Sequence, residues 1–71
     1  MTKYFNIEYD NKNRIMDAIK KIDSSKVILK INSIKVQQES MLKIEITNRT
    51  SDKYVCDDFI KQLSDYLNSQ N

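Results

Sequence analysis

The first hydrophobic positions of the chain recur with the period of a strand and then with that of a helix. Phe5, Ile7 and Tyr9 alternate with Tyr4, Asn6 and Glu8, which predicts a half-buried strand over residues 3–9. Asp10–Asn11 can cap a helix, and the next apolar positions have helical spacing, so we expect a helix over about residues 11–22. These positions are Ile15, Ala18, Ile19 and Ile22, with Met16 beside them.

The apolar positions alternate again from residue 26, but their parity changes within the segment. Val27, Leu29 and Ile31 lie on one side of a strand, whereas Ile34 and Val36 lie on the other. A tight turn at residues 32–33 explains the change, and so does a β-bulge that adds one residue there. We favour the bulge, because a long hairpin that turns at residues 38–40 then places six apolar side chains on one face: Ile31, Ile34, Val36, Leu42, Ile44 and Ile46. The expected pairs are Val36 with Leu42, Ile34 with Ile44, and Ile31 with Ile46.

The last apolar run is a wide helical stripe that follows candidate N-caps at residues 50–52 and extends to about residue 68. Its members are Val55, Cys56, Phe59, Ile60, Leu63, Tyr66 and Leu67. The element order is therefore β-α-β-β-α in one domain of residues 1–71. We expect a two-layer α+β sandwich, in which both helices cover one face of a three-stranded antiparallel sheet. The arrangement is similar to a ferredoxin-like fold that lacks its last strand, a topological analogy that implies no function.

The same patterns predict which side chains form the core. A chain of this length buries only about 60% of the surface that its unfolded form exposes, so we expect marginal stability or help from a partner. The expected core is Phe5, Ile7, Ile15, Ile19, Ile22, Val27, Leu29, Ile31, Leu42, Ile44, Ile46, Val55, Phe59, Leu63 and Leu67. Tyr4 is instead expected on the opposite sheet face, which is either solvated or covered by a partner.

The chain has no Gly and no Pro, so its turns must use other residues. Seven Asn, seven Asp and seven Ser are available for this, because their side chains bond to the nearby backbone. Ten Ile and ten Lys beside a single Ala also match an A/T-rich genome, such as that of a low-GC bacterium or one of its phages or plasmids.

The residue types that carry most enzyme chemistry are missing. Without His the chain lacks the usual general base and the commonest metal ligand, and without Gly it has no phosphate-binding loop. The single cysteine, Cys56, lies in an apolar stripe, where an inert thiol is expected. Asp57 and Asp58 are adjacent on a helix and point about 100° apart. We therefore expect no enzyme activity, cofactor or metal.

The chain also lacks the apolar segments that membranes and secretion require. No stretch approaches the roughly 18 consecutive apolar residues of a membrane span, and the first residues do not form the apolar core of a secretion signal. We expect a protein of the cytosol with no membrane partner.

By elimination, the leading hypothesis is a non-enzymatic module that binds another protein. The composition and size fit a phage or mobile-element inhibitor of a host machine, of the anti-CRISPR kind. The net charge is only +2, but a basic first half and an acidic end would orient a charged partner. The candidate contact residues are Lys3, Tyr4, Asn6, Glu8, Arg14, Lys20, Lys21, Lys30, Asp57, Asp58 and Asp65.

Two other classes of function stay open behind protein binding. The first is nucleic-acid binding by the basic residues of the first helix and the strand after it. Those residues are Lys12, Arg14, Lys20, Lys21, Lys26 and Lys30. A ligand-sensing regulatory domain ranks third.

The ferredoxin-like arrangement also suggests how the chain associates. Without a fourth strand, the strand at residues 3–9 is an open edge that can pair with another strand. We expect this edge to form a homodimer or to receive a partner strand, and Asn6→Pro to disrupt it if the Asn6 N–H points outward.

Overall fold

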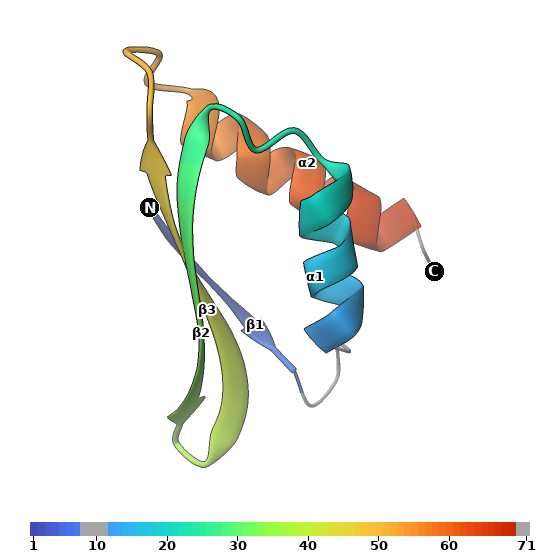
Figure 1. Ribbon diagram of the computed structural model, residues 1–71. Coiled ribbons are helices and arrows are strands. Elements are labelled where there is room, and N and C mark those ends of the chain that lie inside the picture. Colours follow the sequence, from blue (N-terminus) through green and yellow to red (C-terminus); the bar gives the residue numbers. More distant parts are fainter. Residues whose placement is uncertain (8–11, 70–71) are drawn as a thin grey trace.

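The computed structural model describes residues 1–7 and 12–69, which form three strands and two helices. The elements are β1 (Thr2–Asn6), α1 (Lys12–Lys21), β2 (Val27–Val36), β3 (Glu39–Asn48) and α2 (Val55–Ser69). The strands form one antiparallel sheet in the order β1-β3-β2. Both helices lie on the same side of this sheet (Figure 1). The expected small α+β fold is confirmed, whereas Glu8 and Tyr9 of the predicted first strand lie outside the described residues.

The core lies between the helices and the central strand. It consists of Ile15, Ala18, Ile19, Val27, Leu42, Ile44, Ile46, Val55, Phe59, Leu63 and Leu67. Leu42 and Ile44 are completely buried because β3 has a strand on each side and helices above it, whereas Phe5, Leu29 and Ile31 on the edge strands are only half-buried. Each of the fifteen expected core residues is either buried or packed against this cluster.

The predicted bulge in the long hairpin is wrong. The register of β2 with β3 runs without interruption, so that Ile31 faces Ile44 and Ser33 faces Leu42. Ile34 consequently faces Met41, and its side chain lies on the sheet face away from the helices. The expected pairs of Ile34 with Ile44 and of Val36 with Leu42 do not form.

The turn of the hairpin explains the unbroken register. It consists of Gln37 and Gln38 rather than residues 38–40, and it joins Val36 directly to Glu39. Both glutamines have positive φ angles, 51° and 68°, as a two-residue type I′ turn requires. Such a turn matches the twist of the two strands and needs no bulge.

The other described connections use the short polar side chains expected from the composition. The Asp23 carboxylate accepts a hydrogen bond from the Ser25 N–H at 2.9 Å after α1. Before α2, the Asn48 side chain accepts from the Thr50 N–H at 2.8 Å, and Asp52 accepts from the Tyr54 N–H at 2.9 Å. Asp52, one of the candidate caps expected from the sequence, therefore closes the turn that leads into α2, and α2 itself begins at Val55.

Candidate protein-binding surface

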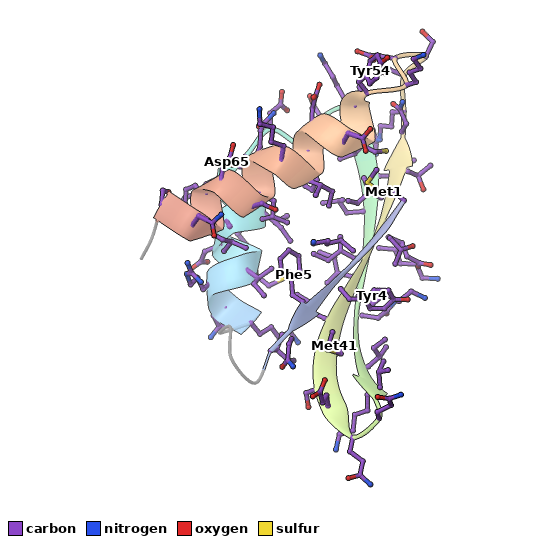
Figure 2. All side chains as sticks on the ribbon, turned by 180° about the vertical axis from the view of Figure 1, so that it is seen from behind. Met1, Tyr4, Phe5, Met41, Tyr54 and Asp65 are labelled. Atoms are coloured by element: carbon purple, nitrogen blue, oxygen red, sulfur yellow. The ribbon has the colours of Figure 1, made fainter. Side chains whose placement is uncertain are left out.

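The sheet has one face that the helices cover and one that they leave open. Figure 2 shows Phe5 pointing toward the helices and Tyr4 pointing away from them. Because side chains alternate along each strand, the register assigns the remaining residues to one face or the other. The open face carries Thr2, Tyr4, Asn6, Ile28, Lys30, Asn32, Ile34, Val36, Glu39, Met41, Lys43, Glu45 and Thr47.

Four apolar side chains gather at the hairpin end of the open face, and we call them the distal patch: Tyr4, Ile34, Val36 and Met41. Tyr4 and Val36 are 47% and 45% exposed, and the other two are half-buried. Together with Gln37 and Glu39 they line a shallow depression of about 380 Å³. Exposed apolar groups that cluster in this way are typical of surfaces that contact another molecule.

The distal patch results from an exchange of faces along the hairpin. Near the helices, Val27 and Leu29 of β2 point into the core. Toward the turn, the positions on that same face become polar, with Ser33 and Lys35, while the apolar side chains move to the open face. The turn end of the hairpin extends beyond the helices (Figure 1), so an apolar side chain on the helix side of this end has no helix to pack against. The change of parity in the sequence was the signal of this patch.

The charges beside the distal patch are balanced. Lys43 and Glu45 form an ion pair at 3.5 Å, and Lys30 lies opposite Glu45 on the neighbouring strand. Glu39 is at the turn end of the same face. Two lysines and two glutamates give the open face no net charge, which is unlike a surface that binds phosphates.

The predicted basic surface is divided between the two sides of the molecule. Lys30 lies on the open face, opposite the side on which α1 packs. Arg14 donates a hydrogen bond to the Leu67 carbonyl and so joins α1 to α2. Lys21 holds its ammonium 5.8 Å from the centre of the Tyr66 ring, and a hydrogen bond with Tyr66 raises the pKa of Lys21. Lys12, Lys20 and Lys26 are exposed.

The other candidate contact residues do not converge on one surface either. Asp57 and Asp58 are exposed in the first turn of α2, and Asp65 lies farther along the same helix (Figure 2). Lys3 is on the helix side of β1, with its ammonium 5.7 Å from the centre of the Phe5 ring. Tyr4 and Asn6 share the open face, and Glu8 lies outside the described residues.

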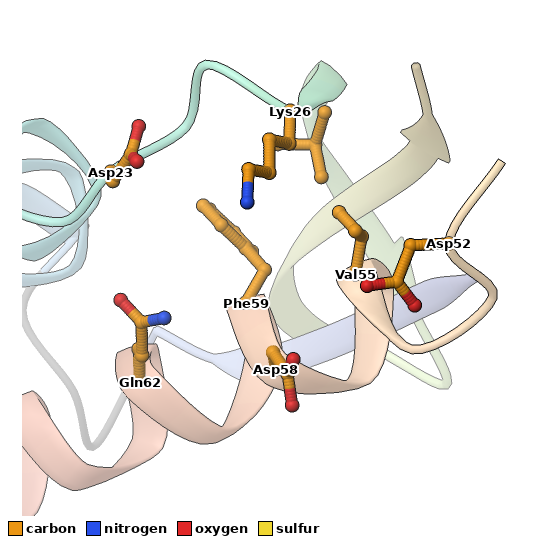
Figure 3. Close-up of a pocket in the computed structure, with 8 residues that line it drawn as sticks. Asp23, Lys26, Asp52, Val55, Asp58, Phe59 and Gln62 are labelled. Carbon is orange, nitrogen blue, oxygen red and sulfur yellow. The ribbon is translucent and has the colours of Figure 1, made fainter. Parts of the chain in front are cut away.

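A small acidic depression lies beside the start of α2 (Figure 3). It has a volume of about 110 Å³, and its lining includes Asp23, Lys26, Asp52 and Asp58. Two of its carboxylates already accept backbone hydrogen bonds, from Ser25 and Tyr54. The backbone bond from Ser25 is the main cause of the lowered pKa of Asp23. The carboxylates of Asp23 and Asp52 therefore serve as hydrogen-bond acceptors within their own loops.

Neither a metal site nor a membrane-spanning helix is found in residues 1–7 and 12–69. No group of three or more His, Cys, Asp or Glu side chains there could hold a metal ion, and neither helix is long and apolar enough to cross a membrane. Cys56 is half-buried against the core, with its sulfur 3.8 Å from the Ile46 carbonyl oxygen.

Sequence reasoning placed Tyr4 on the open face but missed the other three members of the distal patch. It placed Ile34 and Val36 on the apolar face of the hairpin through the bulge. The patch therefore became visible only with the register of the hairpin. No protein-family model, curated protein or solved structure matches the chain.

Proposed function

We propose that this chain is a protein-binding module and that the distal patch is its contact surface. The observation that carries the proposal is the exposure of Tyr4 and Val36 beside Ile34 and Met41 on a sheet face that the helices leave open. Burying such side chains against a partner removes apolar surface from water, which is the main driving force of most protein association.

The surroundings of the distal patch fit a protein partner. The open face has balanced charges, so it neither attracts polyanions nor repels an ordinary protein surface. The patch is also at the end of the hairpin that extends beyond the helices (Figure 1), where a partner can approach it without contacting α1 or α2. An apolar centre with polar residues around it is the usual anatomy of an interface.

Charge substitutions in the distal patch test the proposal. Val36→Lys places a charge in the patch at an exposed position and should leave the fold intact, which circular dichroism checks. Tyr54→Lys is the matched control, because Tyr54 is 57% exposed and belongs to the loop before α2. Tagged parent and variants are expressed in the native host, and captured proteins are quantified by mass spectrometry.

The expected result is a set of proteins that parent and Tyr54→Lys capture equally and that Val36→Lys loses. Direct titration of the purified partner should then show at least a tenfold weaker complex with Val36→Lys, since a desolvated and unpaired charge costs more than about 1.4 kcal/mol. A complex that Val36→Lys and Tyr4→Lys leave unchanged would exclude the distal patch as the contact surface.

The narrower hypothesis concerns the identity of the partner. The small size of the chain and an amino-acid composition that matches an A/T-rich genome support an accessory protein of a phage or mobile element that inhibits a host machine. If so, the captured partner is a component of such a machine, and adding the parent protein lowers the activity of that machine while Val36→Lys does not.

A further inference from the structure

The hydrogen bonds of β1 show which of its backbone groups face outward. Met1 and Ile46 exchange two bonds, at 2.9 and 2.7 Å, and the Ile7 N–H bonds to the Ser40 carbonyl at 3.0 Å. Antiparallel pairing alternates, so the odd-numbered residues of β1 bond to β3. The N–H and C=O groups of Thr2, Tyr4 and Asn6 therefore point away from β3, toward the edge of the sheet.

We propose that two copies of this chain associate through their β1 edges, antiparallel and around a two-fold axis at Tyr4. In this register the backbone groups of Tyr4 in the two copies exchange two hydrogen bonds, and Thr2 lies opposite Asn6 of the second copy. The two sheets then join into one sheet of six strands. The proposal concerns the edge of the sheet and does not depend on the distal patch having a partner.

The charge of Lys3 and the aromatic ring of Phe5 favour this register over the one in which Thr2 lies opposite Tyr4. It sets Lys3 opposite Phe5 of the second copy, on the helix side of the joined sheet. The ammonium of Lys3 already lies 5.7 Å from the centre of the Phe5 ring of its own chain, and the pairing brings a second ring beside it. The alternative register with Thr2 opposite Tyr4 would set Lys3 against Lys3, and like charges directly opposite each other are destabilising.

The second open edge of the sheet is less suited to pairing. Strand β2 presents Lys30 and Lys35 along its length and carries no carboxylate, and edge lysines are a common protection against strand pairing. Strand β1 carries only Lys3, which is half-buried beside Phe5. The edge that is complementary to itself is therefore β1.

The two-fold axis has a consequence for the distal patch. Because Tyr4 of both copies points to the same side of the joined sheet, the two open faces form one continuous surface with all four helices on the other side. Because Tyr4 belongs to the distal patch and lies at the axis, the two patches meet there and extend from it in opposite directions, so a partner with two binding sites would be held bivalently.

Disulfide trapping tests the register directly. In a Cys56→Ser background the introduced thiol is the only one of the chain. In Tyr4→Cys the two Cα atoms are about 5.5 Å apart across the axis, within the roughly 4.4–6.8 Å that a disulfide spans. In the control Thr2→Cys, the two copies of residue 2 are offset by four residues, about 13 Å along the strand. Mild oxidation at a concentration at which the parent is dimeric should cross-link Tyr4→Cys, whereas Thr2→Cys should form the dimer without a cross-link. Equal cross-linking of both, or none in either, would overturn the proposed register.

Sedimentation equilibrium tests the edge without any thiol. Thr2→Pro removes an outward N–H and leaves both the hydrogen bonds to β3 and the distal patch intact, and Thr2→Ala is its matched control. We expect Thr2→Pro to weaken the dimer at least tenfold, Thr2→Ala to behave as the parent, and Val36→Lys to remain dimeric. A parent protein that stays monomeric up to roughly 1 mM has no association of useful strength, and that result, or a dimer insensitive to Thr2→Pro, would refute the β1 edge.

Discussion

The turn between β2 and β3 holds two glutamines in a backbone conformation that a Cβ atom disfavours, and replacing the second by glycine should stabilise the protein. Gln38 has a φ angle of 68° and Gln37 one of 51°. Both values lie in the left-handed region, which glycine occupies without steric cost. Natural type I′ turns accordingly prefer Asn followed by Gly.

The magnitude follows from two opposing effects. A left-handed conformation costs a residue with a Cβ atom about 1–2 kcal/mol. Glycine avoids this cost but loses more conformational entropy on folding, about 0.5–1 kcal/mol relative to alanine. Gln38→Gly should therefore raise the free energy of unfolding by about 0.5–1 kcal/mol. For a domain of this size that corresponds to a rise in Tm of about 2–8 °C.

The same substitution in α2 is the matched control. Gln62 is exposed in the middle of this helix, where glycine in place of a good helix former costs about 0.5–1 kcal/mol. Thermal and urea unfolding followed by circular dichroism should show Gln38→Gly more stable than the parent and Gln62→Gly less stable, with equal m-values. If Gln38→Gly lowers the Tm as Gln62→Gly does, the left-handed turn and the register built on it are wrong.

Three further predictions concern the core, the basic residues and the loss of stability at low pH. Phe59 is 3% exposed, so Phe59→Ala should cost about 3–5 kcal/mol in urea unfolding, whereas Val36→Ala should cost less than about 0.5 kcal/mol; similar losses would favour the bulged hairpin. In mobility-shift assays at low salt the protein should not shift DNA or RNA. Nucleic-acid binding would be established instead by a shift that weakens steeply as the salt concentration rises, and by a flatter salt dependence after Lys20 and Lys21 are replaced by alanines. The hydrogen bonds from Ser25 lower the pKa of Asp23 from its ordinary 3.8, so their contribution to stability is present above that pH and is lost as the pH falls through the folded pKa. Asp23→Ala should remove this part of the acid destabilisation in melts between about pH 5 and pH 2, and an unchanged pH profile would contradict it.

Local patterns sufficed for the helices and the core. The apolar stripe from Val55 to Leu67 is buried along one side of α2, and Ile15 and Ile19 do the same in α1. A helix repeats every 3.6 residues, so spacing alone tells which of its sides is apolar. The turn at Asp52 before α2 was equally local, because the Asp52 side chain accepts from a backbone N–H only two residues ahead.

The candidate contact surface could not be found in the same way. Of the predicted contact residues, Tyr4 alone belongs to the distal patch, and the charged ones are spread over both sides of the molecule. Charge along the chain does not show which residues become neighbours. The other members of the distal patch come from β2 and β3, thirty or more residues along the chain from Tyr4, and only sheet pairing brings them together.

The hairpin separates what the sequence by itself determined from what the tertiary structure decided. The chain alone specified two strands, and it showed that the apolar parity changes between Ile31 and Ile34. A bulge that keeps one apolar face and a regular strand that exchanges faces produce the same pattern of letters. The tertiary structure decided between them, because a two-residue turn at Gln37–Gln38 determines the register and the helices cover only part of the hairpin. Side-chain alternation then directs Ile34 and Val36 to the open face, since a strand without a bulge cannot return them to the core.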